Sequence, residues 1–279
     1  MRNPILIIAK KEILDNIRNK WVIIISVLFA FFALVSSYFP STFLVDGWQS
    51  FESTIGIMLG SIGWIVPIVG IMLGYAAILG EIEKGSMSAL IAYPTTKIEI
   101  LLGKFLGLGG VLSLSLIFGF GLAGIVIAIN ISDANFGGYL VFIFETVLFG
   151  LVFLSLAMFF SNVLKKRSTA IGVAIFLWLF FILLLPMILG GILIMGVGIE
   201  EIMAGSFQVP EWYFGLSLFN PMDVYSSLVT MSITGLSSSS EIPLTYPSYY
   251  STGLMVFILS AWIAVFQFLS YWFFNKKDM

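Results

Sequence analysis

The 279-residue chain contains no cysteine and no histidine. Disulfides, thiolate or imidazole metal sites, cysteine nucleophiles and histidine general bases are therefore all excluded. Charged residues are also scarce, at 10% of the chain, whereas an ordinary soluble domain carries about 25%. The net charge is only −2 and no basic stripe is present, so nucleic-acid binding has no electrostatic basis. These absences exclude most familiar enzyme sites, and we do not expect the chain itself to be an enzyme.

Hydrophobic residues make up 59% of the chain and fall in long blocks. A helix that rises 1.5 Å per residue needs about 20 apolar residues to cross the hydrocarbon of a bilayer. Six segments meet this requirement, at residues 21–39, 54–79, 105–131, 136–161, 169–198 and 254–274. The sequence therefore predicts an all-α integral membrane protein with six transmembrane helices.

The positions of Lys and Arg predict the orientation. All 13 basic residues lie before the first span, in the second or fourth connection, or after the last span. The first, third and fifth connections contain acidic residues but no Lys or Arg. Because basic residues near span ends are retained on the cytoplasmic side, we expect a multi-pass plasma membrane protein with both termini in the cytoplasm.

The chain divides into a short leading element and one membrane domain. Residues 1–20 place isoleucines at helical spacing, which predicts a cytoplasmic amphipathic helix on the inner membrane surface. Residues 21–279 form the membrane domain, with a cytoplasmic connection at 80–104 and a large extracytoplasmic segment at 199–253. We expect short outer helices and a flexible tip in that segment, and a kink, break or strong tilt near Pro186 in the fifth span.

Small residues form a continuous face on the second predicted span. They recur at steps of three and four residues, at Gly56, Gly60, Gly63, Pro67, Gly70 and Gly74. Such a face lets a neighbouring backbone approach closely. Packing within the chain and a dimer or moving interface are both consistent with it.

The connection at 80–104 reads GEIEKGSMSALIAYPTTKIEILLGK. Ser86 is suited to cap a short helix, Leu90 contributes to an apolar face, and Pro94 disfavours helix at Tyr93. A short cytoplasmic helix with an exposed apolar face is typical of a docking element for a partner.

The order of GE, EKGS, AYP and ILLGKFLG in this connection resembles the first cytoplasmic loop of ABC exporter permeases, especially the NosY-like permeases linked to maturation of copper enzymes. The opening IAKKEILDNIRNKW and the segment NPMDVYSSL at 220–228 extend the resemblance over essentially the whole chain. The resemblance implies a permease that dimerises and binds two separate cytoplasmic ABC ATPases through a coupling helix. The positions carried over to that coupling role are Glu81, Glu83, Gly85, Ser86, Leu90, Tyr93, Pro94 and Lys97. Lys97 departs from the family, which commonly has arginine there, so the charge is kept but the planar fork is not.

No GxxxxGK[ST] phosphate loop occurs in the chain. We therefore expect ATP and Mg²⁺ on the partner ATPase and no cofactor or metal on this chain.

The 12 methionines are scattered without a paired motif, which favours core filling over a copper path. The resemblance to exporter-type permeases implies export or extrusion of a substrate that the residues do not identify. An extracytoplasmic accessory protein is a further possible partner, and Asn220 or Asp223 is suited to cap an outer helix.

Glu145 is the single charged residue within a predicted span. A buried carboxylate costs about 2.5–3.5 kcal/mol on insertion scales unless it is paired, hydrated or protonated. Glu145 is therefore a candidate for the translocation path, with a hydrogen-bonded structural glutamate as the alternative. Two other functions stay open: an ATPase-independent secondary carrier or channel that uses Glu145, and a membrane assembly subunit that transports nothing.

Overall fold

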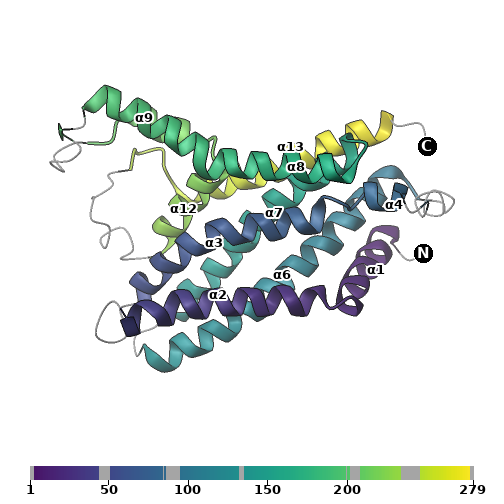
Figure 1. Cartoon of the computed structure of the whole chain (residues 1–279), viewed down its shortest axis with the longest axis horizontal. Coiled ribbons are helices and arrows are strands. Elements are labelled where there is room, and N and C mark those ends of the chain that lie inside the picture. Colours follow the sequence, from purple (N-terminus) through teal and green to yellow (C-terminus); the bar gives the residue numbers. More distant parts are fainter. Residues whose placement is uncertain are drawn as a thin grey trace.

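The computed structural model describes residues 3–43, 51–83, 85, 95–131, 135–198, 200–201, 208–233 and 246–276. Every regular element in these ranges is helical (Figure 1). Five helices are long and apolar enough to cross a membrane: 54–83, 97–130, 136–163, 167–197 and 252–276. A sixth crossing is formed when the bent pair α1 and α2 is counted as one span. The predicted all-α membrane fold is therefore confirmed.

The chain begins with an elbow. Helix α1 (Pro4–Arg18) starts at the N-cap Asn3, whose side chain accepts a hydrogen bond from the Ile5 backbone N–H. Helix α2 (Trp21–Phe43) leaves α1 at a bend of 69°, and Lys20 at the corner has a φ of 59°. The predicted amphipathic helix is thus present as a separate element that turns away from the first span.

One side of α1 packs against the start of α6 (Lys97–Asn130). Ile8 and Ala9 are buried there against Gly103 and Gly107. A Cβ atom at Gly103 would lie 2.7 Å from the Ile8 Cβ atom, closer than real Cβ atoms approach. The two glycines therefore let α1 lie directly on the α6 backbone.

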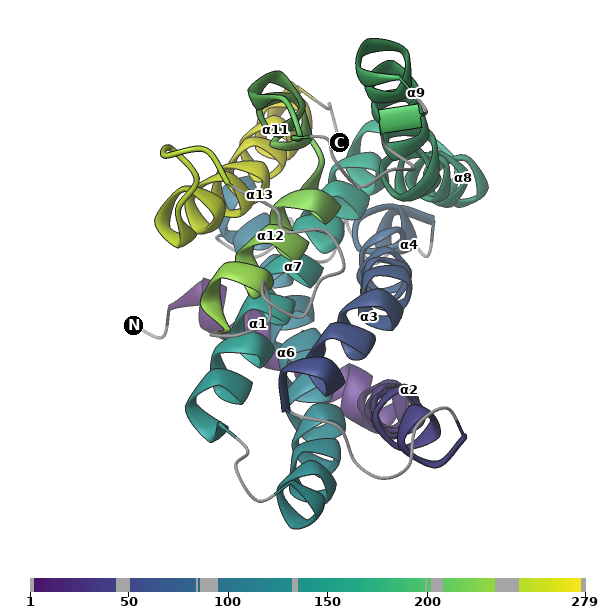
Figure 2. The same ribbon diagram turned by 90° about the vertical axis from the view of Figure 1, so that its left-hand side faces the viewer.

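Helices α3 (Phe51–Gly74) and α7 (Phe136–Val163) form the centre of the bundle. Figure 2 shows them between α2 and α6 on one side and α8, α9 and α13 (Thr252–Lys276) on the other. A Cβ atom at Gly74 would lie 2.8 Å from the Leu154 backbone oxygen, and one at Gly70 would lie 2.9 Å from the Gly150 oxygen. These glycines of the small-residue face are used for packing within the chain. At Gly60, by contrast, no atom of the described residues lies within 4 Å of such a Cβ.

The fifth span is continuous but contains a widened turn. Helix α8 (Arg167–Leu179) passes through the π-helical segment η1 (Phe180–Leu184) into α9 (Leu185–Val197). The Leu185 N–H bonds to the Phe180 oxygen five residues earlier. Because a proline ring clashes with the carbonyl four residues before it, the wider turn directly ahead of Pro186 relieves that clash. The expected irregularity is therefore a π-turn.

Two short helices, α11 (Glu211–Ser217) and α12 (Pro221–Ser232), follow the fifth span as expected. Helix α12 packs against the middle of α7, where Tyr225 stacks on Phe149 with ring centroids 4.4 Å apart. The Tyr225 hydroxyl also lies 2.8 Å from the Thr146 hydroxyl. The expected tip of this segment lies within residues 234–245, outside the described residues.

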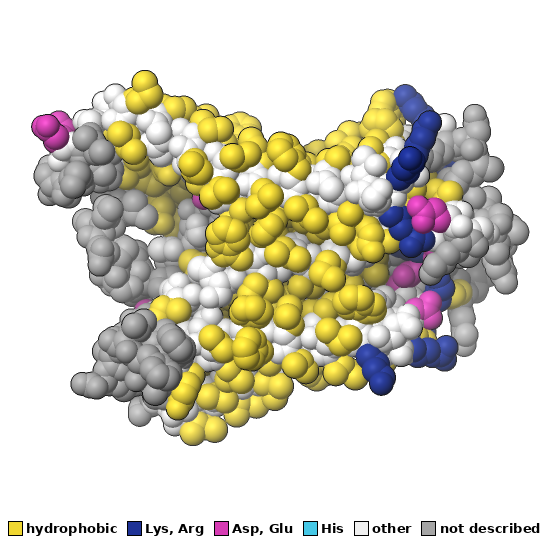
Figure 3. Space-filling view, in the orientation of Figure 1, with side chains coloured by type: hydrophobic (Ala, Val, Ile, Leu, Met, Phe, Trp, Pro, Cys, Tyr) yellow, Lys and Arg dark blue, Asp and Glu magenta, His cyan; other side chains and the backbone are white. Residues whose placement is uncertain are grey.

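Both termini lie at one end of the bundle (Figure 1), and the Lys and Arg side chains of the face in Figure 3 gather at that same end. The short helix α4 (Leu79–Glu83) lies there as well. The charge segregation seen in the sequence is thus a property of one end of the folded molecule.

Candidate functional site

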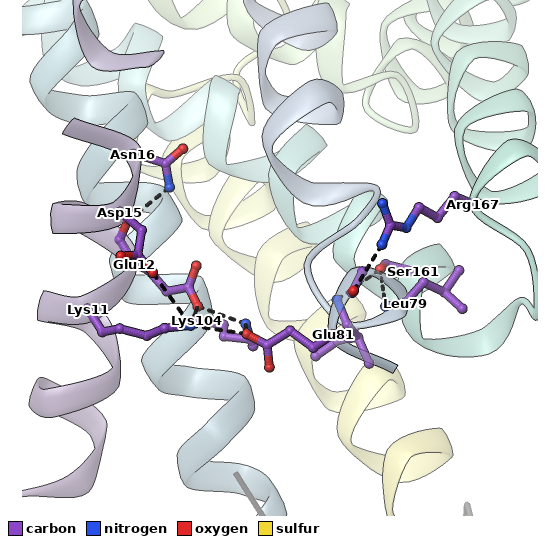
Figure 4. Close-up of polar contacts among 11 residues, drawn as sticks. Lys11, Glu12, Asp15, Asn16, Leu79, Glu81, Lys104, Ser161 and Arg167 are labelled. Atoms are coloured by element: carbon purple, nitrogen blue, oxygen red, sulfur yellow. Dashed lines mark hydrogen bonds and ion pairs between the residues drawn. The ribbon is translucent and has the colours of Figure 1, made fainter. Parts of the chain in front are cut away.

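A buried lysine joins three elements at the end of the bundle that carries the termini (Figure 4). Lys104, on the second turn of α6, has a side chain only 2% exposed. Its Nζ atom donates to Glu12 Oε1 of α1 at 2.8 Å and to Glu81 Oε1 of α4 at 2.7 Å. A buried ammonium ion is tolerated only with close anionic partners. The bonds of Lys104 therefore hold helices α1, α4 and α6 in a fixed arrangement relative to one another.

Lys11 lies on the outer side of this cluster. Its Nζ atom is 3.3 Å from Glu81, 3.5 Å from Glu12 and 3.6 Å from Asp15. Burial lowers the pKa of Lys11, but the Glu12 and Glu81 carboxylates together with Asp15 raise it more, so the pKa lies above its ordinary value. Lys11 therefore stays charged at neutral pH. We call Lys11, Glu12, Asp15, Glu81 and Lys104 together the ionic cluster.

The other side of α4 is held by the corner between α7 and α8. The Ser161 hydroxyl accepts hydrogen bonds from the backbone N–H groups of Ile78 at 3.0 Å and Leu79 at 3.2 Å. These are donors at the start of a helix, which have no partner within the helix itself. Arg167 donates to the Gly80 carbonyl at 2.9 Å and forms an ion pair with Glu83 at 2.6 Å. Every turn of α4 is thus tied to a neighbouring helix.

The structure places the predicted coupling residues in different settings. Glu81 belongs to the ionic cluster, with its side chain 13% exposed, and Glu83 pairs with Arg167 while remaining 44% exposed. Gly85 has a φ of +71°, a left-handed conformation that suits glycine. Lys97 donates to the Asn275 carbonyl at 3.2 Å. The remaining four, Ser86, Leu90, Tyr93 and Pro94, lie outside the described residues.

Four residues of this region were not identified from the sequence: Glu12, Lys104, Ser161 and Arg167. Lys104 was visible as the last residue of the patterned connection, but nothing in the sequence indicated that it would be buried. Glu12 lies 92 positions away, on another element. Only the packing of α1 on α6 brings these two residues together.

Glu145 lies apart from the ionic cluster, on α7. Its side chain is 3% exposed, and its Oε1 atom accepts a hydrogen bond from the Ser232 hydroxyl at 2.5 Å. The Oε2 atom is buried and has no hydrogen-bond partner among the described residues. Glu145 thus meets the last turn of α12 and leaves one carboxyl oxygen unused.

Asn220 connects the outer helices to the fifth span. Its side-chain oxygen accepts from the Met222 N–H at 3.1 Å, which confirms the expected cap of α12. Its amide group donates to the Phe181 carbonyl at 2.9 Å and to the Asp223 carboxylate at 3.0 Å. In a π-turn the Phe181 carbonyl accepts a hydrogen bond from the backbone N–H five residues later, which is position 186. Pro186 has no N–H to donate. Asn220 therefore supplies the donor that Pro186 cannot.

A bundle of long apolar helices with a short, internally braced helix at its charged end defines a multi-pass membrane protein. Comparison with known protein families identifies the class of membrane protein. A model of the family described as "ABC-2 family transporter protein" matches residues 6–279. The chain belongs to this family and is the transmembrane permease component of an ABC transporter.

Two curated relatives carry the same printed name, "Probable ABC transporter permease protein NosY". The protein from Stutzerimonas stutzeri is 30% identical to this chain, with 99% of each chain covered. The protein from Pseudomonas aeruginosa is also 30% identical, with 98% of each covered. The resemblance read from the connection at 80–104 is therefore confirmed over nearly the full length. Permeases of this family work with an ABC ATPase in general.

Proposed function

We propose that the connection between α4 and α6, residues 84–96, receives the movement of a separate cytoplasmic ABC ATPase. The proposal rests on the two hydrogen bonds that the buried Lys104 ammonium donates to Glu12 and Glu81. Glu81 precedes the connection and Lys104 follows it, and the two side chains meet at 2.7 Å. Both ends of the connection are thus clamped together, with α1 held by Glu12 at 2.8 Å.

Because these bonds connect several helices, a movement of the connection is transmitted to all of them at once. Force on the connection reaches α3 through α4, α6 through Lys104, α1 through Glu12 and α8 through the pair between Glu83 and Arg167. Each of these elements belongs to, or leads into, a membrane-spanning helix. ATP binding in the partner would favour one of two packings of the spans. Exposed Glu83, together with the apolar face that the sequence predicts around Leu90, forms the proposed docking surface, and Glu81 acts inside the permease.

The remaining parts of the proposal concern assembly and direction. The chain acts as a homodimer in the plasma membrane with its basic end in the cytoplasm, and it exports or extrudes its substrate. The outward glycines of the fifth span support dimerisation, because Gly172, Gly190, Gly191 and Gly196 have no atom of the described residues within 4 Å of an added Cβ. Small residues of this kind allow helices to approach closely in lipid. Glu145, with its unused carboxyl oxygen, is the candidate group on the path between protomers.

The natural lack of cysteine permits a clean test of the orientation. Ser86→Cys and Ser239→Cys each introduce one thiol, in the second and fifth connections. A membrane-impermeant maleimide applied to intact cells should label Ser239→Cys alone, and both variants after the membrane is opened. Labelling of Ser86→Cys in intact cells would contradict the proposed side for the ATPase.

Transmission is tested separately from docking. The variant Glu81→Gln weakens the clamp but leaves the Leu90 face intact, so it should retain the ATPase on purification and lose the effect of the permease on ATP hydrolysis. Glu83→Gln, on the exposed side of α4, instead removes a carboxylate of the proposed docking surface, so it should weaken retention of the ATPase. Loss of the ATPase from Glu81→Gln in a folded protein would instead place Glu81 in the docking surface.

A further inference from the structure

A cavity of about 520 Å³ lies between the elbow of α1 and α2 and the inner ends of α3 and α4. Its volume falls within the roughly 300–1,000 Å³ of typical small-molecule sites. Towards the other end of the molecule, α2 and α3 are joined by a hydrogen bond of 2.9 Å between Ser36 and Ser61. From there the two helices diverge towards the end that carries the termini (Figure 1). The cavity is the wedge left by this divergence.

The deep part of the wedge is apolar, and it is lined from both walls. Side chains of α2 (Ile24, Leu28) face those of α3 (Val69, Met72) across it, with Leu108 of α6 also in the lining. Ile24, Leu28 and Met72 are 54%, 37% and 45% exposed. Helix α3 belongs to a membrane-crossing segment, and α2 belongs to the bent pair that is counted as the sixth. An apolar space between two such helices suits an alkyl chain better than water.

The mouth of the wedge is polar and is formed by the ionic cluster. Glu12 and Glu81 have side chains only 12% and 13% exposed, and both are bonded to Lys104. Lys11 and Asp15 have side chains 49% and 45% exposed, so both remain accessible from the mouth. Their Nζ and Oδ2 atoms are 3.6 Å apart. A ligand head that meets them therefore encounters a cation and an anion side by side.

We propose that this wedge binds one zwitterionic phospholipid of the surrounding bilayer, with an acyl chain between α2 and α3 and its headgroup at the ionic cluster. The phosphate lies towards Lys11 and the headgroup ammonium towards Asp15. Both halves of the ligand match the lining, since hydrocarbon meets the apolar walls and the head meets two opposite charges. Phosphatidylethanolamine has this chemistry, whereas phosphatidylglycerol has the phosphate but lacks the ammonium. The site requires only this chain, so it stands whether or not the proposed ATPase docking is correct.

The experiment uses the full chain in vesicles of phosphatidylethanolamine and phosphatidylglycerol. A trace of phosphatidylethanolamine with a diazirine on its acyl chain is photolysed, and labelled peptides are mapped by mass spectrometry. Labelling of residues 24–28 and 69–73 should exceed labelling at Ile125, an α6 side chain that is 58% exposed, by several-fold. Equal labelling at these places would overturn the site, and this outcome is decisive in the unmodified protein.

A variant that fills the wedge with a larger side chain is compared with a variant that enlarges an exposed side chain elsewhere. Leu28→Trp should reduce the labelling of α3 several-fold, whereas Phe118→Trp, at a side chain 59% exposed on α6, should leave it unchanged. Undiminished labelling in monodisperse Leu28→Trp would contradict a discrete site. A probe built on phosphatidylglycerol should label the wedge less than the phosphatidylethanolamine probe, and Asp15→Asn should remove that preference. Equal labelling by both probes in the unmodified chain would overturn the headgroup assignment.

Discussion

Replacing Lys104 with methionine removes the buried cation that lies between the carboxylates of Glu12 and Glu81. The Nζ atom lies 2.8 Å and 2.7 Å from their oxygens and is almost fully buried. Removing one partner from a buried ion cluster costs about 3–5 kcal/mol. The two carboxylates keep some access to water and to Lys11 at 3.3–3.5 Å, so we expect about 2–4 kcal/mol of destabilisation.

Thermal unfolding of the purified chain, followed by tryptophan fluorescence, measures this loss. The expected fall in Tm for Lys104→Met is roughly 5–15 °C, at about 2–4 °C per kcal/mol for a chain of this size. Lys10→Met, an exposed lysine on α1, should change the stability by less than about 0.5 kcal/mol.

The cost should arise from unpaired charge and not from lost volume. Adding Glu12→Gln and Glu81→Gln to Lys104→Met removes the repulsion and should restore most of the stability, because neutral replacement of a whole buried cluster is often tolerated. A Lys104→Met protein as stable as Lys10→Met would refute the clamp. So would a triple variant that is no more stable than Lys104→Met alone.

Four further predictions concern the other parts of the bundle. Asn220→Leu removes both the cap of α12 and the donor to the carbonyl of the π-turn, and thermal unfolding should show a loss of about 2–4 kcal/mol, with a smaller loss in Asn220→Ser, which can still cap α12. Burial raises the pKa of Asp223 to about 6 from 3.8, against the hydrogen bond from Asn220 that lowers it. Since a carboxyl with a raised folded-state pKa favours the folded protein as it is protonated, the Tm should rise as the pH falls from 7.5 through 6, and Asp223→Asn should diminish this rise. Gly74→Ala should cost about 1–3 kcal/mol because the methyl meets α7. Gly60→Ala should cost nothing, because no atom in the described part of the chain lies within 4 Å of the added methyl. Glu145→Gln should leave the Tm unchanged within the error of the measurement, and transport lost without any change in Tm would assign the carboxyl to the path.

The sequence predicted the parts of the fold that depend on local pattern. Span-length apolar blocks gave the membrane helices, and the isoleucine spacing of residues 1–20 gave α1. The position of Pro186 indicated an irregular fifth span, although not that a π-turn would accommodate it. These features depend on neighbouring residues, which a sequence displays directly.

The ionic cluster could not be predicted in this way. Its members come from α1, α4 and α6, and they meet only because Gly103 and Gly107 bring α1 onto α6. The acidic residues at 81 and 83 therefore looked alike in the sequence. In the structure Glu81 is enclosed and Glu83 is exposed, because the first faces α1 and α6 and the second faces Arg167 at the edge of α8.

The most direct test of ATPase coupling is purification of the tagged chain from its native membrane, with identification of the retained proteins by mass spectrometry. Leu90→Asp places a charge on the predicted docking face, and Leu90→Met preserves that face. The unmodified chain and Leu90→Met should each retain an ABC ATPase, and Leu90→Asp should lose it while keeping its Tm. A folded, unmodified chain that never retains an ATPase, or a Leu90→Asp protein that retains it fully, would contradict the account.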